Sequence, residues 1–205
     1  MRIILLVLVF SLSLATMILA GPLSNIEQLG KIMYQDLDFS FNRTQSGEAL
    51  FTTHCSKCHA VSAYPDGGPP LFTSYAYENI GLPANPLLSG NPVDYGLGGF
   101  LEADFNSDLP LIGDAMYAAH YGKFKIPTLR NIALTPPYGH NGYFPELREM
   151  IRFLNSRDVS PEWPAPEVWT NLNTIDVGDM GLTDAQIDDI VQFLHTLSDR
   201  RLNRP

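Results

Sequence analysis

Two cysteines and a histidine stand close together in the first third of the chain. Cys55, Cys58 and His59 form a C-x-x-C-H run, and the sequence contains no other cysteine. Two thiols at this spacing can add to the two vinyl groups along one edge of a porphyrin. The histidine that follows then lies beneath the ring, where a neutral imidazole can bind the iron as its proximal ligand. This run is the attachment signature of c-type haem, so we expect one covalent haem c.

Three other uses of the run are less consistent with the sequence. A redox-active C-x-x-C of the thioredoxin type lies at a strand-to-helix turn of a βαβ unit, and no such strand precedes Cys55. A structural zinc site needs two further Cys or His at ligand spacing, and no other histidines are paired in that way. A disulfide across only two residues would close a strained, reducible loop. Haem attachment is therefore the favoured reading.

The chain opens with features of an export signal. Arg2 precedes an apolar run from Ile3 to Ala20, which is typical of a secretory signal peptide. Small residues allow cleavage after Ala15 or after Ala20. The alternative is an uncleaved membrane anchor, because this run of 18 fairly apolar residues is near the lower limit for spanning a bilayer. In either case we expect the rest of the chain in the periplasm.

The net charge of the chain is -9. Such an acidic balance argues against nucleic acid as a partner, because phosphate binding needs clustered Lys and Arg. Long-range attraction toward a redox partner protein with a basic docking face would suit this charge, although solubility alone accounts for it equally well. Membrane association is expected only if the signal stays uncleaved.

Helices are predicted at three places. Ser46 is placed to cap a helix that leads into the haem run. Leu147, Met150, Ile151 and Leu154 recur at helical spacing, which predicts a helix from about Pro145. Thr183 and Gln186 form a capping box that opens a last helix, and its apolar stripe comprises Ile187, Ile190, Val191, Leu194 and Leu197.

Between these helices the chain is rich in residues that form turns. Gly, Pro, Asn and Asp are dense from Tyr64 to Pro110, which predicts long irregular loops. We therefore expect a mainly α fold, a cytochrome c-like domain of a few helices with long loops around one haem. We expect the cytochrome c domain to span residues 47–205, after a signal peptide over residues 1–20 and an N-terminal arm over residues 21–46.

A long motif after these loops resembles a known family. Residues 123–144, KFKIPTLRNIALTPPYGHNGYF, look like the signature of the second haem domain in bacterial dihaem cytochrome c peroxidases and MauG-like proteins. The tail from Pro166 through the segment 181–184 to Leu194 is similar to the ending of that domain. The resemblance implies a haem-binding oxidoreductase with peroxidase-like relatives.

The chain also departs from the family's pattern. Residues 29–36 and 44–46 resemble the opening of the family's first domain, which should run into a first C-x-x-C-H. Here Ser46 is followed at once by residues 47–51, which resemble the approach to the second haem run. The first haem domain is therefore expected to be missing. In the family that domain carries the haem that reacts with peroxide, while the haem of the second domain supplies electrons. This chain therefore resembles a single-haem member of the family that keeps the second haem domain.

A second departure concerns the distal iron ligand. In the family this ligand, Met in the peroxidases and Tyr in MauG-like members, lies fourteen residues beyond the histidine that matches His140. Here that residue is Leu154, which cannot bind iron. Met150 lies on the same helical face and is either a distal ligand or a core residue. Met116 and Met180 are less favoured as distal ligands. At the position of Met180 the family usually has a packed Leu. We expect an open or water-ligated iron lined by Met150 and Leu154.

Four further residues are candidates for roles near the haem, and the resemblance concerns three of them. It implies a place near a haem edge for His140. Arg130 is either a donor to a buried haem propionate, for which its guanidinium is suited, or a structural residue that bonds a carboxylate or loop carbonyls. The backbone carbonyls of Thr135 and Pro137 match positions that help to bind an interdomain calcium in the family. Because the partner residues of the first domain are missing, calcium is not expected.

Three functions remain open at this point. The first is electron transfer by a single low-spin haem. The second is a peroxidase or MauG-like oxidant that uses an open iron position, although peroxide reduction takes two electrons and no distal acid–base pair can be named from the sequence. The third is a ligand-binding sensor or a subunit of a larger redox complex. We expect electron transfer.

Overall fold

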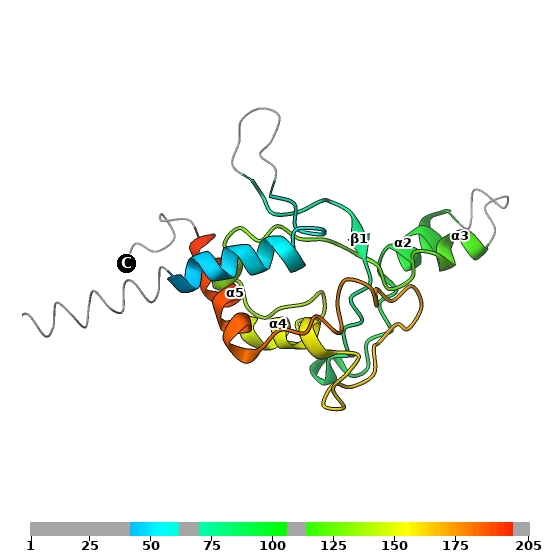
Figure 1. Cartoon of the computed structure of the whole chain (residues 1–205). Helices are drawn as coiled ribbons and strands as arrows, with labels where there is room; N and C mark the ends of the chain where they lie inside the picture. Colours follow the sequence, from blue (N-terminus) through cyan, green and yellow to red (C-terminus); the bar gives the residue numbers. More distant parts are fainter. Residues whose placement is uncertain (1–41, 62–69, 106–113, 199–205) are drawn as a thin grey trace, which may run out of the picture. The chain divides into compact units, whose positions relative to one another are not determined.

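The computed structural model describes residues 42–61, 70–105 and 114–198. Residues from Arg43 onward belong to one compact unit, Arg43–Pro205. The expected signal peptide, and most of the expected arm over 21–46, lie outside the described residues. The described part is mainly helical and carries one small sheet, which confirms the predicted fold class (Figure 1). None of the described helices is long and apolar enough to cross a bilayer.

The elements follow one another with long connections. A helix over residues 42–54 comes first. The labelled elements are β1 (Tyr77–Glu78), η1 (Pro86–Leu88), α2 (Gly96–Phe105), α3 (Asp114–Ala118), β2 (Phe124–Lys125), η2 (Ile132–Leu134), α4 (Leu147–Ser156) and α5 (Asp184–Thr196). Strands β1 and β2 pair antiparallel, with Tyr77 opposite Lys125. This order places the C-x-x-C-H run directly after the first helix.

The first helix lies side by side with α5 (Figure 1). Gly47 allows this approach, because a Cβ atom there would overlap the backbone of Asp189 on α5. One turn later the fully buried ring of Phe51 packs on Phe193, with ring centroids 5.1 Å apart. The prediction that Ser46 caps this helix is wrong, since residue 42 is already helical and Ser46 is an exposed interior position. Packing of Gly47 and Phe51 against α5 holds this segment as helix interior, where the local capping signal of Ser46 has no role.

Helix α4 confirms the predicted apolar stripe and adds a second buried face. Leu147 and Ile151 are buried, while Met150 and Leu154 are half-buried. Phe153, outside the predicted stripe, is completely buried because its ring packs on Phe144 and Trp163. The helix is therefore enclosed on two sides, which holds Met150 and Leu154 in a defined position.

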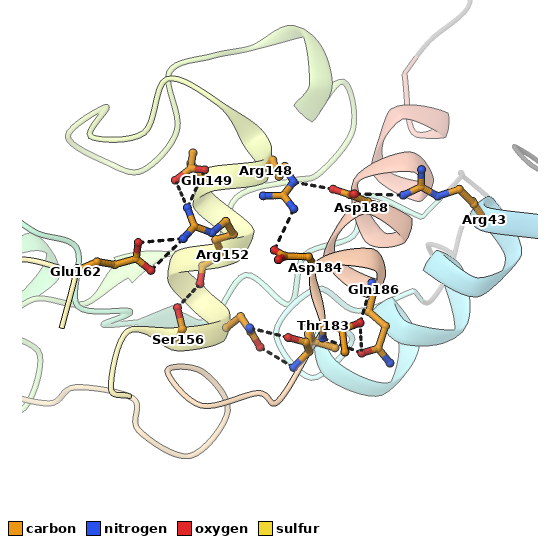
Figure 2. Close-up of polar contacts among 12 residues, drawn as sticks. Arg43, Arg148, Glu149, Arg152, Ser156, Glu162, Thr183, Asp184, Gln186 and Asp188 are labelled. Atoms are coloured by element: carbon orange, nitrogen blue, oxygen red, sulfur yellow. Dashed lines mark hydrogen bonds and ion pairs between the residues drawn. The ribbon is translucent and has the colours of Figure 1, made fainter. Parts of the chain in front are cut away.

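Ion pairs join α4 and α5 across their exposed side (Figure 2). Arg148 donates to Asp188 at 2.6 Å and to Asp184 at 3.1 Å, and Arg43 of the first helix donates to Asp189 at 2.7 Å. These side chains are partly exposed, so each pair contributes little to stability. They specify the alignment of the three helices, whose stability comes from the buried side chains between them.

The predicted capping box of α5 is present. The Thr183 hydroxyl accepts a hydrogen bond from the Gln186 amide, and the Gln186 side chain accepts one from the Thr183 amide at 2.9 Å (Figure 2). Thr183→Ala should therefore lower the free energy of unfolding by about 1 kcal/mol. Urea denaturation followed by circular dichroism measures this effect. Thr183→Ser keeps the hydroxyl and serves as the control, and equal midpoints for Ala and Ser would contradict the prediction.

One helix lies where the sequence predicted irregular loop. Helix α2 begins at Gly96 and contains Gly98 and Gly99, and three glycines in four residues disfavour a helix. Tertiary packing overrides this preference, because a Cβ atom on Gly98 would overlap Tyr121. The remaining described part of 64–110 is mostly irregular, as expected.

Candidate functional site

The C-x-x-C-H run forms a tight turn at the end of the first helix. The Cys55 amide donates to the Phe51 carbonyl at 2.8 Å, and the His59 amide donates to the Cys55 carbonyl at 2.8 Å. These bonds continue the helical path for one turn, so both thiols and the imidazole are held by the same short piece of backbone. Because Phe51 is buried in the core, the run is anchored rigidly.

A backbone carbonyl orients the His59 ring. Nδ1 of His59 lies 2.9 Å from the carbonyl oxygen of Phe72. A carbonyl can only accept, so Nδ1 carries the proton and Nε2 keeps a lone pair for a metal. Burial lowers the pKa of His59, an effect that the carbonyls of Phe72 and Pro127 partly oppose. The imidazole is therefore neutral and directed, as an iron ligand must be.

Phe72 is itself held firmly beside the run. Its φ of 55° lies in the left-handed region, which a bulky residue seldom adopts. The ring is buried and meets Phe51 and Phe193 at 5.8 Å and 6.3 Å between ring centroids. This aromatic cluster fixes the backbone of Phe72, and with it the carbonyl that orients His59.

The two thiols have raised pKa values. Burial, with a smaller effect of Cys58, raises the pKa of Cys55 to about 12. The pKa of Cys58 is raised by burial first and then by the carboxylates of Glu78 and Asp176. Thiols of this kind stay protonated at neutral pH and are poor zinc ligands and poor partners in disulfide exchange. Within the described part of the chain no cluster of three His, Cys, Asp or Glu side chains could hold a metal ion.

The surroundings of the run suit an apolar, planar group. Cys55 is half-buried and packs against the main core. Other half-buried apolar side chains pack against the same core: Leu50, Ile80, Ile132, Tyr143, Met150, Leu154, Met180 and Val191. Together with two free thiols and a neutral imidazole, these residues fit a covalently attached haem.

Arg130 lies over the ring of Phe72. Its Nε donates to the carbonyl of Pro70 at 2.9 Å, and its guanidinium lies 5.2 Å from the centre of the Phe72 ring. The bond to a loop carbonyl agrees with the structural role considered for this residue. A bond to a haem propionate stays a prediction.

His140 lies in a different environment from His59. Its ring stacks on Phe124, with centroids 3.5 Å apart, and its Nε2 lies 3.7 Å from a carboxylate oxygen of Glu167. Burial lowers the pKa of His140, while Asp94 and Glu167 act in the opposite direction. These contacts border a small cavity that Asn79 also lines. The predicted place of His140 near a haem edge stays a prediction.

Three residues that the structure places beside the run could not be identified from the sequence. The amide of Asn173 donates to the carboxylates of Glu78 and Asp176, each at 3.3 Å, and Asp176 pairs with Lys57 at 2.6 Å. Both carboxylates act electrostatically on Cys58. The one local feature that could have pointed to Asn173 is a turn. Its side chain accepts hydrogen bonds from the backbone amides of residues 175 and 176, as Asn commonly does in turns.

Comparison with known proteins gives a consistent result. The chain is 33% identical, over an alignment of 198 residues, to methylamine utilization protein MauG of Paracoccus denitrificans (strain Pd 1222), covering 82% of this chain and 48% of MauG. It is 30% identical over 168 residues to cytochrome-c peroxidase IdrP1 of Denitromonas iodatirespirans, covering 75% of this chain and 40% of that protein. No protein-family model matches. The chain thus spans about half the length of the curated relatives it matches or less.

Among solved structures, the fold is similar to the diheme peroxidase BthA from Burkholderia thailandensis E264. The match has a TM-score of 0.61 and 26% identity, and it covers 78% of this chain and 43% of BthA. The helices and loops around the C-x-x-C-H run therefore have counterparts in a solved protein.

Proposed function

Since the chain belongs to the family of MauG-like proteins and dihaem cytochrome c peroxidases, we propose that it is an exported c-type cytochrome with one haem that transfers single electrons. The observation that carries this proposal is the single C-x-x-C-H run, in which His59 is neutral and oriented by the Phe72 carbonyl. Cys55 and Cys58 hold the haem, and His59 binds its iron. When bound, this group supplies reversible one-electron chemistry.

The protein contributes a rigid setting for that chemistry. The bond from Nδ1 of His59 to the Phe72 carbonyl fixes the ring and raises the basicity of the ligand nitrogen. The contacts of Phe51, Phe72 and Phe193 keep this carbonyl in place. A setting that does not rearrange suits a protein that gains and loses an electron repeatedly.

The proposed partner is a redox protein with a basic docking face. The chain carries a net charge of -9, and the carboxylates of Glu78 and Asp176 lie close enough to Cys58 to raise the pKa of its thiol. Since Lys57 pairs with Asp176 at 2.6 Å, Glu78, Asp176 and Lys57 together leave one net negative charge beside the residue that would hold one edge of the haem. Such a charge attracts a basic partner toward the edge through which electrons pass.

A second candidate function is that of a peroxidase or MauG-like oxidant. The relatives with these names and the missing ligand atom at Leu154 favour it. An iron without a distal ligand would be open to peroxide. The haem iron supplies one of the two electrons that peroxide takes up, so the second would have to come from oxidation of the porphyrin or of a side chain, which leaves a radical there, or from a partner cytochrome.

Peroxide turnover separates the two functions. With a reduced cytochrome as donor, the purified holoprotein should exchange single electrons reversibly, yet its turnover of hydrogen peroxide should be roughly 100-fold slower than that of BthA, at the lower end of what general acid–base catalysis contributes. The two proteins are assayed side by side by following oxidation of the donor. Rapid turnover that saturates with peroxide would instead support the oxidant.

A further inference from the structure

The structure brings a second methionine to the end of α4. The segment 178–182 lies along the last turn of this helix, where the Gly178 amide donates to the Leu154 carbonyl at 2.6 Å and the Met180 amide donates to the Asn155 carbonyl at 2.9 Å. Met180 therefore lies beside Leu154, the position at which the family supplies its distal iron ligand. In the sequence the two residues are far apart, so their proximity could not be predicted.

Specific contacts hold this segment in one place. The Asn155 side chain accepts a hydrogen bond from the Leu182 backbone amide at 2.8 Å and donates one to the Leu182 carbonyl at 3.0 Å. Gly178 has a φ of 105°, and a Cβ atom there would overlap the carboxylate of Asp158. The backbone around Met180 is thus bound to α4 on both sides, so the position of its Cα is well defined.

The Met180 side chain borders the core on which the haem run is anchored. It is half-buried and packs against the same core cluster as Cys55, Met150 and Leu154. Its thioether sits on three rotatable bonds, so the sulfur can adjust to a metal while the backbone stays fixed. Met150, in contrast, belongs to the interior of α4, one turn of about 5.4 Å before Leu154.

We propose that Met180, together with His59, would bind the haem iron. This inference rests on the proposed function and specifies its site: the thioether replaces the ligand that Leu154 cannot provide. A His–Met pair favours the ferrous state and raises the reduction potential. It also closes the iron to peroxide, which is what an electron carrier needs, and it replaces the open iron position expected from the sequence.

Two matched variants test the assignment. Met→Leu keeps the side-chain volume nearly constant, so Met180→Leu and Met150→Leu should both fold and both attach haem. The ferric wild type and Met150→Leu should show the far-red absorption band of methionine bound to haem iron, together with a low-spin EPR spectrum. Met180→Leu should lose the band completely, become high-spin, and bind carbon monoxide readily in the ferrous state.

The spectra of these variants test whether Met180 binds the iron, and electron transfer is tested separately. A band that persists in Met180→Leu, a band lost in Met150→Leu, or its absence from the wild type would each overturn the role of Met180. Reversible one-electron exchange in any of these cases would leave the electron carrier standing. A chain without covalent haem would refute the proposed function itself.

Discussion

Replacing Cys55 and Cys58 together by serine should reduce covalent haem from one per chain to none. The two thiols are the only cysteines, so no other residue can form a thioether bond. Haem staining of denaturing gels and a pyridine haemochrome assay measure the attached haem. The wild type should keep its colour on a denaturing gel and after treatment with acid acetone.

A variant within the same run controls for local disruption. Lys57 lies between the two cysteines with an exposed side chain and bonds only to Asp176 among its described partners. Lys57→Ala should therefore retain one covalent haem per chain. Colour that leaves the wild type in acid acetone, or that remains attached in the double serine variant, would contradict covalent attachment through this run.

Replacing Arg157 by alanine should destabilise the fold by about 3 kcal/mol, because its buried guanidinium makes several hydrogen bonds and those from a charged group are the stronger kind. Its side chain is only 2% exposed. The guanidinium donates to both carboxylate oxygens of Asp158, at 2.7 and 2.6 Å, and to the carbonyls of Ile80 and Asn173, each at 2.8 Å. Its removal leaves the carbonyls of Ile80 and Asn173 without their charged donor, while the partly exposed Asp158 loses its partner. Urea denaturation of the holoprotein measures the loss.

Arg152 provides the matched control for Arg157. It lies on α4, one and a half turns earlier, and pairs with Glu149 and Glu162 near the surface (Figure 2). Since its side chain is 30% exposed, Arg152→Ala should cost no more than about 1 kcal/mol. Similar losses for the two arginine variants would show that Arg157 does not hold the loops together.

The helices that could be predicted were those whose signal is local. The stripe of Leu147 and Ile151, and the capping box of Thr183 and Gln186, depend on residues within a few positions of one another. Helix α2 could not be predicted, because its glycines disfavour a helix until Gly98 packs on Tyr121. The burial of Arg157 could not be predicted either, since the carbonyls that accept its hydrogen bonds come from two separate segments, at Ile80 and at residues 173–177.

The candidate site divides in the same way. Cys55, Cys58 and His59 could be identified because thioether attachment and proximal ligation require residues adjacent in sequence. The carbonyl that orients His59, and the thioether placed beside Leu154, come from segments that approach only in the folded chain. The sequence therefore predicts the residues that would attach the haem and the proximal ligand of its iron. A second ligand of the iron depends on tertiary contacts, so the sequence does not predict it.

The contact at Gly47 has a consequence for the order of folding. It joins the helix that leads into the haem run to α5, near the other end of the domain. Contacts between such distant segments slow folding, because a long loop must close before they form. During synthesis the first helix has to wait for α5 before it can bury Phe51. A chain cut just before Thr183 should therefore leave the haem run without its main support, and such truncated chains should be degraded by proteases.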